Sequence, residues 1–497
     1  MLNKCPKSIV FCGIVIKFAA KNRNELMKYC LRPIYILLSV VLFFVACADD
    51  DNDEIVLYND IAITGFQITS GTVSGVEGVG LSYIPFSIDH CFGEAFGKIE
   101  NKTPLPYGTD LNTLFCGYYT KNNALVFIED LMTGEWKYLS STDVQNFSTT
   151  RYLHVMSSDN TAERTYELKV NVYKEKGDEF VWNRLADEPD IAGLEAMKAF
   201  VVGGRIMVFG KDGTQTTVLS ADAAGTPSWQ KSGITFGADA YRNVAVLNDT
   251  LFVLDGTRLV RSTDMGETYT DVPYTYTSSV AGAALKQLVG ASTTEIYALA
   301  DDGKIAVSTD KGETWTPDAG AGASDNDENM EWLPAEDIAF SSAPFAYNDM
   351  TDYVLMAGNR ASAEHNGDTK AVVWRKIVEY APYSHAGKWI CMMPDDVSYY
   401  PLPRLDKLAV VSYDGSLLAL GGAGKGECTA EPLSAIYESR DGGVTWKANT
   451  SYALPAELDR NTPAFAVAVD ADSYIWIVCA GTGQVWKGRL NRLGWTN

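Results

Sequence analysis

Short segments of alternating apolar and polar residues cover much of the chain after residue 55 and predict β-strands. In Thr165–Tyr173, apolar side chains at every second position alternate with polar ones, the pattern of an antiparallel strand with one buried face. The turn-forming stretch Ser158–Thr161 separates this segment from a similar one at Tyr152–Met156, and Leu81–Ile88 also alternates. Several short strands of this kind predict a β-sandwich of immunoglobulin-like type over residues 55–175.

A second pattern begins after the charged stretch Lys174–Glu179, which we interpret as a linker between two domains. From Phe180 onward, short apolar strands recur with a closing aromatic residue every ~40–50 residues, the spacing of four-stranded propeller blades. Six units can be counted, closed by Trp229, Tyr269, Trp315, Trp389, Trp446 and Trp495. The sequence therefore predicts a six-bladed β-propeller over 180–497, with a seven-bladed ring as the alternative.

The ends of this repeat array predict how the ring closes. The last unit reaches Trp495 with no room for a fourth strand, and Val181–Leu185 has no blade of its own in front of it. We expect Val181–Leu185 to supply the outer strand of the sixth blade, which would leave no open sheet edge.

Three copies of a polar motif, S-x-D-x-G-x-T followed by an aromatic residue, predict tight turns in these blades. The aspartate accepts hydrogen bonds from nearby backbone N–H groups, and the glycine supplies a positive φ. The motif resembles the Asp-box of sialidase-type (BNR-repeat) propellers, where it lies at the outer edge of the blade. The resemblance implies a structural role, not a catalytic or metal-binding one, for Asp264, Asp310 and Asp441.

The N-terminal segment predicts export and lipid attachment. The apolar run Ile34–Val45 follows basic residues, is short for a transmembrane helix and is typical of a signal peptide. Phe44–Cys47 resembles a bacterial lipobox, which implies a lipid on Cys47, and Asp49–Glu54 resembles the acidic tag of surface lipoproteins in Bacteroides-type bacteria. We interpret residues 1–46 as an upstream extension plus signal peptide and 47–54 as an acidic tether; an ordinary secretory signal is the alternative.

The net charge of the chain limits the classes of partner that it is expected to bind. The chain has 63 acidic and 41 basic residues and a net charge of −22, which repels nucleic acid and anionic lipid. We expect no nucleic-acid partner, membrane contact only through the lipid anchor, and a monomer.

Cysteine and histidine spacing predicts neither a metal site nor a cofactor. No pair of cysteines has C-x-x-C spacing, and the four histidines are scattered. A Cys91–Cys116 disulfide and free thiols are both compatible with the sequence.

Catalytic motifs are also missing. By resemblance, sialidase activity requires an arginine triad, a tyrosine nucleophile paired with a glutamate, and an acidic aspartate; Arg205–Met207 approaches only the first arginine motif, without its proline. The sequence contains no G-x-S-x-G and no H-E-x-x-H. We therefore assign no catalytic residue and favour a non-catalytic protein. The alternatives are a glycoside hydrolase on the same scaffold and a structural subunit of an outer-membrane assembly.

Candidate ligand-binding residues lie in the longest loops between predicted strands and between blades. Aromatic side chains beside arginine, asparagine and aspartate suit sugar rings or peptides, which need an apolar surface and hydrogen-bonding groups. The candidates are Trp332, Arg360, His365, Tyr399, Tyr400 and Arg404. They predict a glycan or protein ligand on the propeller face.

Taken together, these features resemble an uncharacterised family of two-domain lipoproteins from Bacteroides-type bacteria. The residues that carry the resemblance are Cys47, Ser87–Asp89 with Leu105–Thr109, the strand Tyr166–Tyr173 leading to Trp182, and the repeats. The resemblance implies a sandwich followed by a propeller at the outer membrane or cell surface. It implies no activity.

Overall fold

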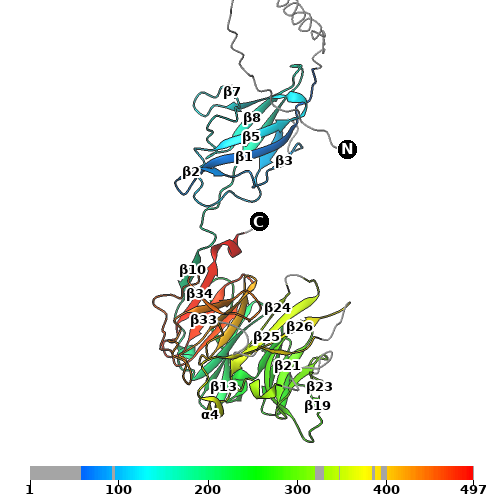
Figure 1. Ribbon diagram of the computed structural model, residues 1–497, viewed down its shortest axis with the longest axis vertical. Coiled ribbons are helices and arrows are strands. Elements are labelled where there is room, and N and C mark those ends of the chain that lie inside the picture. Colours follow the sequence, from blue (N-terminus) through cyan, green and yellow to red (C-terminus); the bar gives the residue numbers. More distant parts are fainter. Residues whose placement is uncertain are drawn as a thin grey trace, which may run out of the picture.

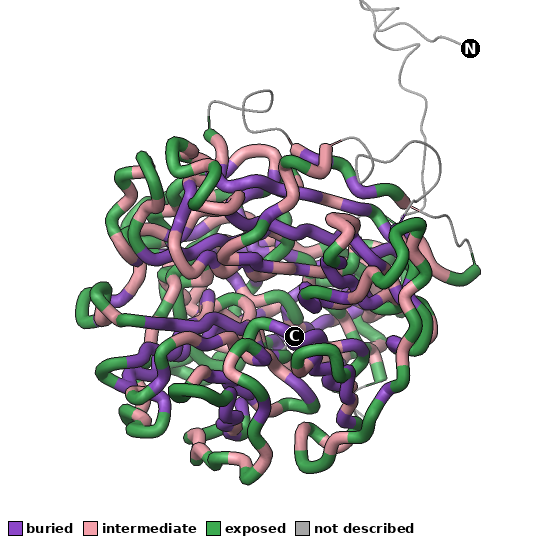
Figure 2. The backbone as a smooth tube through the Cα atoms, turned by 90° about the horizontal axis from the view of Figure 1, so that it is seen from below, coloured by how far each residue is buried: buried purple, intermediate pink, exposed green. Residues whose placement is uncertain are grey.

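Two β-rich units follow one another along the long axis of the molecule (Figure 1). The computed structural model describes residues 57–91, 96–318, 329–345, 348–382, 387–392 and 400–495. Figure 2 shows that buried residues follow the strands and that exposed residues gather at the turns between them. Within the described ranges, no helix has the length and apolar character needed to cross a membrane.

Two sheets packed face to face form the N-terminal unit. The smaller has the order β2-β1-β5 and the larger β3-β4-β9-β8-β6-β7. Phe66 and Cys116 from the first sheet share one core with Leu153 and Leu168 from the second. The elements are β1 (Ile63–Val73), β2 (Val76–Gly80), β3 (Ser87–Asp89), β4 (Phe96–Glu100), β5 (Phe115–Thr120), the 3-10 helix η1 (Lys121–Asn123), β6 (Leu125–Glu129), β7 (Trp136–Tyr138), β8 (Arg151–Met156) and β9 (Glu163–Lys169).

The alternation read from the sequence holds in one segment and fails in another. In β9, Tyr166 and Leu168 are buried while Glu167 between them faces outward. The expected strand over Leu81–Ile88 is wrong, because only β3 is extended there. The Ile84 N–H donates to the Leu81 carbonyl in a turn, and the following proline has no N–H with which to continue a ladder.

Six sheets form the C-terminal unit. From the ring axis outward the first five run β11-β12-β13-β14, β15-β16-β17-β18, β20-β21-β22-β23-β19, β24-β25-β26-β27 and β28-β29-β30-β31, and the sixth runs β32-β33-β34-β10. Each of six hydrophobic clusters fills the space between two neighbouring sheets, and one of them joins the sixth sheet to the first. The sheets therefore close a ring in which β11, β15, β20, β24, β28 and β32 surround the axis.

The strands of this unit have the following bounds: β10 (Phe180–Arg184), β11 (Ala196–Val202), β12 (Arg205–Asp212), β13 (Gln215–Asp222), β14 (Gln230–Gly237), β15 (Val244–Leu247), β16 (Thr250–Asp255), β17 (Arg258–Ser262), β18 (Thr270–Asp271), β19 (Thr275–Tyr276), β20 (Leu285–Ala291), β21 (Ile296–Ala300), β22 (Ile305–Ser308), β23 (Thr314–Pro317), β24 (Glu336–Pro344), β25 (Thr351–Asn359), β26 (Val372–Glu379), β27 (Ile390–Met392), β28 (Ala409–Tyr413), β29 (Ser416–Leu420), β30 (Ile436–Ser439), β31 (Lys447–Asn449), β32 (Phe465–Val469), β33 (Ile475–Cys479) and β34 (Val485–Leu490). Its helices are short: α2 (Pro189–Ala192), α4 (Ser362–His365), η2 (Ala240–Arg242), η3 (Met330–Trp332) and η4 (Asn491–Gly494).

The first strand of the unit completes the last sheet, as the sequence predicted. β10 pairs antiparallel with β34, with Phe180 opposite Leu490 and Arg184 opposite Trp486. The Trp182 side chain donates from Nε1 to the Ala453 carbonyl at 2.9 Å. This pairing covers the edge of β34, which would otherwise present unpaired backbone groups.

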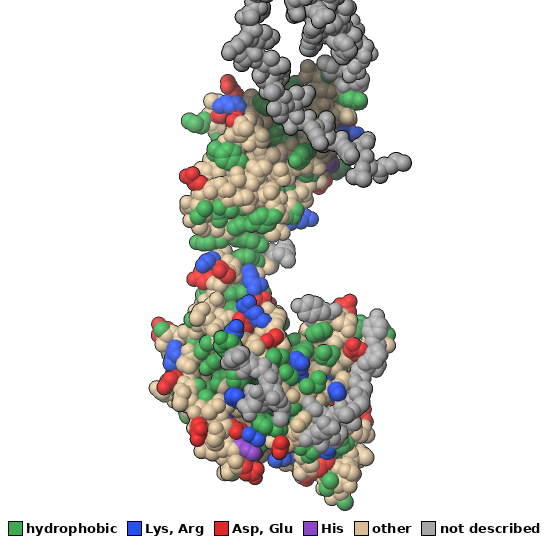
Figure 3. All heavy atoms as spheres, viewed as in Figure 1, with side chains coloured by type: hydrophobic (Ala, Val, Ile, Leu, Met, Phe, Trp, Pro, Cys, Tyr) green, Lys and Arg blue, Asp and Glu red, His purple; other side chains and the backbone are tan. Residues whose placement is uncertain are grey.

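Trp495 departs from its expected position. We expected it to close the sixth sheet, but it follows η4 and stacks on Tyr173 of the linker, with ring centroids 3.7 Å apart. A side chain on Gly177 would collide with the Trp495 ring. The outer position is already filled by β10, so this tryptophan packs between the two units instead. Charged side chains of both signs surround this narrow waist (Figure 3).

Cys91 and Cys116 are both free thiols. Cys116 is completely buried, and burial raises the pKa of its thiol to about 12, whereas Cys91 is exposed. The disulfide that the sequence permitted is therefore not formed.

Candidate functional site

Two of the predicted residues pack against each other: Arg360, in the loop between β25 and β26, and Trp332, at the end of η3. Arg360 pairs with Asp368 through Nε and Nη2, which donate to the two carboxylate oxygens at 2.9 and 2.8 Å. Its guanidinium carbon also lies 4.0 Å from the centroid of the Trp332 ring. Such a bidentate, stacked arginine is already satisfied by its own protein.

Arg404 fixes the same loop from inside. Its side chain is fully buried and donates to the carbonyl oxygens of Arg360, His365 and Asp368 and to Ser362 Oγ. The several donors of a guanidinium can hold many acceptors at once. Arg404 therefore holds the loop in place and presents no surface to a ligand, contrary to the expectation from sequence.

The remaining candidates lie apart. His365 ends α4 and is partly exposed. Tyr400 is 52% exposed, and the Lys447 ammonium lies 4.6 Å from its ring centroid. Its carbonyl accepts a bond from Trp446 N–H next to a repeated turn, away from α4. Tyr399 lies outside the described residues.

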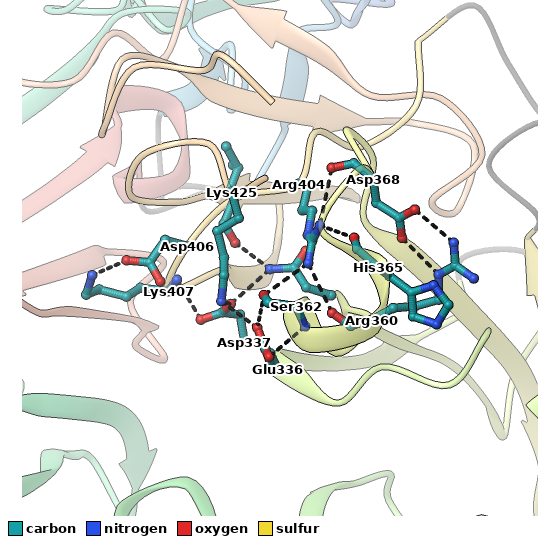
Figure 4. A network of polar contacts seen from close by, with 12 residues as sticks. Glu336, Asp337, Arg360, Ser362, His365, Asp368, Arg404, Asp406, Lys407 and Lys425 are labelled. Atoms are coloured by element: carbon teal, nitrogen blue, oxygen red, sulfur yellow. Dashed lines mark hydrogen bonds and ion pairs between the residues drawn. The ribbon is translucent and has the colours of Figure 1, made fainter. Parts of the chain in front are cut away.

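Two adjacent carboxylates at the start of β24 connect the loop to the ring axis (Figure 4). Ser362 donates to Glu336 through both its backbone N–H and its hydroxyl. Lys425, from the loop between β29 and β30, donates to Glu336 Oε2 at 2.7 Å and to Asp337 Oδ2 at 2.8 Å. Asn359 adds a bond to Asp337 at 2.9 Å. Both carboxylates are therefore held by cations and donors of the chain itself.

Glu336 is an ionised group in this environment. Burial raises its pKa, but the hydrogen bonds from Lys425 and Ser362 outweigh burial and lower it to about 2. The same contacts raise the pKa of Lys425 against the opposing effect of its own burial. A carboxylate whose pKa is this low stays charged at neutral pH and is a poor general acid.

Next to this network, a cavity of about 290 Å³ occupies one mouth of the axial channel. All six innermost strands, or the segments leading into them, contribute to its wall. Its polar lining residues are Lys198, Tyr241, Arg242, Gln287, Glu336, Asp337, Lys407 and Lys425. Four cations thus face two carboxylates, in a protein whose net charge is −22. The mouth is the place where the ring concentrates positive charge.

Lys198 spans this channel. It extends from β11 and donates from Nζ to the Ile338 carbonyl of β24 at 2.7 Å, and these two strands lie on opposite sides of the ring. Removal from water lowers the pKa of Lys198 to about 8; Asp337 opposes the shift and Arg242 adds to it. Within the described residues, no carboxylate forms an ion pair with Lys198. Its ammonium forms the floor of the mouth.

Beyond Lys198 the channel becomes apolar. A second cavity of about 190 Å³ is lined by Lys198 and otherwise by small or apolar side chains such as Ala199, Ala291, Phe340 and Val467. Small residues are needed here because the inner strands converge at the axis. Of these two cavities, the mouth is therefore the one that offers several polar groups to a ligand.

Sequence reasoning missed the residues of the mouth. Lys198 is a lone charge in the apolar strand Ala196–Val202, which is a signal that could have been noticed. Arg242, Gln287 and Lys407 carry no such signal, because their meeting depends on the closure of the ring. Within the described ranges, no group of histidine, cysteine and acidic residues is arranged to hold a metal ion.

The three repeated turns share one set of hydrogen bonds. In each, the aspartate Oδ1 accepts from the threonine N–H at 2.9 Å and Oδ2 accepts from the threonine hydroxyl. The glycine N–H donates to the serine hydroxyl, and each glycine has a φ between +84° and +88°. Asp264, Asp310 and Asp441 are therefore used within their own turns. Hydrogen bonds from Thr268 lower the pKa of Asp264 to about 2.

Two family models match the chain. The DUF6242 beta propeller domain matches residues 176–497, and the N-terminal domain of unknown function DUF6242 matches residues 65–170. No curated protein shows significant sequence similarity to the chain. The all-β class predicted from the sequence is confirmed by the strands and by the propeller match.

Solved structures resemble the chain in fold alone. YCF48 bound to D1 peptide is 12% identical with a TM-score of 0.31, over 63% of this chain and 95% of that one. The fucose-specific lectin from Aleuria aurantia is 10% identical with a TM-score of 0.33, over 61% and 93%. Trypanosoma rangeli sialidase is 10% identical with a TM-score of 0.33, over 62% and 59%.

Proposed function

The chain belongs to the DUF6242 family, and we propose that it is a surface-exposed lipoprotein whose propeller binds a glycan or a protein without catalysis. The binding site in this proposal is the mouth of the axial channel. The single observation that carries it is the cavity of about 290 Å³ in which polar side chains from separate sheets converge. Concave sites with a few convergent polar groups are the usual form of a ligand pocket.

The side chains around the mouth are better suited to ligand binding than to catalysis. Glu336 and Asp337 both accept bonds from Lys425, and the lowered pKa of Glu336 makes this carboxyl a poor proton donor. Lys198, Arg242 and Gln287 instead bring donors to the cavity. Donors fixed on rigid strands suit recognition, because little ordering is needed when a ligand binds.

The position of the mouth fits display at a surface. α4, which is linked to the mouth through Ser362 and Glu336, lies at the end of the propeller remote from the sandwich (Figure 1). In the proposal the lipid is attached to Cys47, on the N-terminal side of the sandwich. The sandwich then separates the binding face from the membrane.

A glycan-array screen of the full chain in detergent, with release of reducing sugar measured for every hit, tests the binding proposal. We expect binding without turnover, and loss of binding in the variant Lys425→Met. Turnover of a bound glycan would contradict the non-catalytic assignment. If no glycan on the array binds and no protein is captured from outer-membrane extracts, the binding proposal is contradicted altogether.

Detergent phase partitioning tests the lipid anchor separately. The full chain should enter the detergent phase when expressed in a bacterium that lipidates exported proteins, and Cys47→Ala should move it to the aqueous phase. Cys30→Ala is the matched control and should change nothing. A Cys47→Ala variant that still partitions into detergent would contradict the lipoprotein assignment.

A further inference from the structure

We propose that the mouth of the channel binds the carboxylate of one acidic sugar residue, with Lys198 and Arg242 as the anion-binding groups. This inference rests on the proposed binding function and specifies the class of ligand. It is argued from the charges, the unused hydrogen-bonding groups and the shape of the cavity.

Ion pairing around the mouth is uneven. Lys425 is matched by Glu336 and Asp337, and Lys407 pairs with its neighbour Asp406. Arg242 is 46% exposed and reaches only Asp239, at 3.6 Å. Lys198 has no ion-pair partner among the described residues. Two cations therefore face the cavity without a buried counter-ion, and an anion placed between them would relieve their repulsion.

The hydrogen-bonding groups support the same conclusion. One N–H of the Lys198 ammonium is used by the Ile338 carbonyl, at 2.7 Å. A lysine ammonium has three donors, so two remain for a ligand in the mouth. The two wall carboxylates accept bonds from the chain itself, including those from Lys425. The mouth is thus rich in donors, and a ligand that brings acceptors suits it.

The rest of the wall favours a sugar over an acidic peptide side chain. Tyr241 and Gln287 also line the cavity, and among the described residues the Tyr241 hydroxyl and the Gln287 amide form no hydrogen bond with another side chain. Neutral groups of this kind bind hydroxyls, which an aspartate or glutamate side chain lacks. Leu408 and Ile338 add an apolar wall for the C–H groups of a sugar ring. The cavity volume of about 290 Å³ suits a single sugar residue.

The position of Lys198 also predicts how binding varies with pH. Its pKa is about 8 in the free protein, because burial lowers it. A bound carboxylate would raise that pKa, so affinity should be complete below about pH 8 and fall as pH rises beyond it. The charged and titratable groups facing Lys198 across the mouth are Tyr241, Arg242, Glu336, Asp337, Lys407 and Lys425.

Calorimetric titration of the full chain with methyl α-D-glucuronoside and methyl α-D-glucoside tests the inference. The two probes differ only in a carboxylate and a hydroxymethyl group. We expect the glucuronoside to bind at least tenfold more tightly, about the value of one charged hydrogen bond. Lys198→Met should remove that preference and flatten the pH profile between pH 6 and 9. Arg242→Gln changes an exposed side chain, and we expect the fold to stay intact. It should weaken binding of the glucuronoside and leave binding of the glucoside unchanged.

Lys231→Met is the matched control, because this exposed lysine lies on the outer strand β14 and reaches Asp212 only at 3.5 Å. It should leave both titrations unchanged. Equal affinity for the two probes, or an unchanged preference in Lys198→Met, would overturn the inference. Tighter binding of N-acetylglutamate amide than of the glucuronoside would overturn the sugar assignment. Binding of neutral glycans alone on the array would do the same while leaving the proposed function standing.

Discussion

Buried charges are the feature that stands out at the scale of single residues. Lys376 has a side chain only 3% exposed, yet it donates to Glu295 at 2.9 Å and to Asp318 at 2.6 Å. Trp389 Nε1 adds a third donor to this cluster, bonding to Asp318 at 2.9 Å. Burial raises the pKa of Asp318 even though Lys376 lowers it. Such a cluster is stable only while every member keeps its partners.

Lys376→Met should therefore destabilise the fold strongly. The substitution removes the cation that Glu295 and Asp318 share, and we expect a loss of about 3–5 kcal/mol in unfolding free energy. Urea denaturation of the full chain measures it. Lys231→Met, which removes an exposed lysine, should change the same quantity by less than ~1 kcal/mol. Equal effects of the two substitutions would show that the buried cluster is not stabilising.

The aspartates of the repeated turns make a different prediction, for acid stability. The folded pKa of Asp264 is about 2, below its ordinary value of 3.8, chiefly because Thr268 donates to it. A lowered folded pKa contributes stability above pH ~4 that is lost as pH falls toward 2. Asp264→Asn should therefore lower the melting temperature at pH 6 and make it less dependent on pH between 4 and 2.

Asp222→Asn is the control for that experiment. Asp222 ends β13 in the first sheet, and its exposed side chain forms no hydrogen bond with any other described residue. The melting temperatures of Asp222→Asn should equal those of the unmodified chain at each pH. If the melting temperatures of the unmodified chain and of Asp264→Asn fall equally as pH decreases, the assigned role of the aspartate is contradicted.

At the scale of elements, the ring is closed by strands from its two ends. β10 comes first in the propeller and β34 last, and they lie side by side in one sheet. Trp182 packs directly on Gly488, where a methyl group would come within 2.4 Å of the indole. Glycine is required here because the ring lies against the backbone. The joint depends on side-chain fit as well as on backbone pairing.

Gly488→Ala should accordingly destabilise the propeller by about 1–3 kcal/mol, the usual cost of an overpacked site. In a Trp182→Ala background the same change should cost less, since one of the two colliding rings is gone and only that of Phe180 remains. Denaturant titration of the two single variants and the double variant measures this coupling. Additive effects would contradict the proposed packing.

At the scale of the whole molecule, the two units meet through few groups. Tyr173 and Trp495 stack between them, and a hollow of about 660 Å³ beside this stack is lined by Tyr83 and Tyr107 of the sandwich. Each unit has its own hydrophobic core. A small contact between separate cores limits relative motion less than a large apolar interface would.

Trp495→Ala should loosen this junction without unfolding either unit. We expect a broader distribution of overall dimensions in small-angle X-ray scattering, because the stacked contact is lost. Trp136→Ala, which removes an exposed tryptophan of the sandwich, should leave the distribution unchanged. An unaltered scattering profile for Trp495→Ala would indicate that the linker backbone alone sets the arrangement.

The sequence by itself determined the local features of this protein. Alternation identified strands such as β9 because side chains on a strand point to opposite faces, a property of the local backbone. The repeated turn motif identified the propeller because its hydrogen bonds lie within a few residues, as at Asp310. The outer strand β10 followed from counting which repeat lacked a strand.

Only the tertiary structure decided which polar residues meet. Lys198 and Lys425 are 227 positions apart in the sequence (425 − 198), and they line one cavity because the ring closes. Contacts with the β25–β26 loop likewise bury Arg404, which its place in a long loop had suggested to be an exposed ligand-binding residue. Exposure and convergence depend on contacts between distant segments, and no local pattern of residues encodes them.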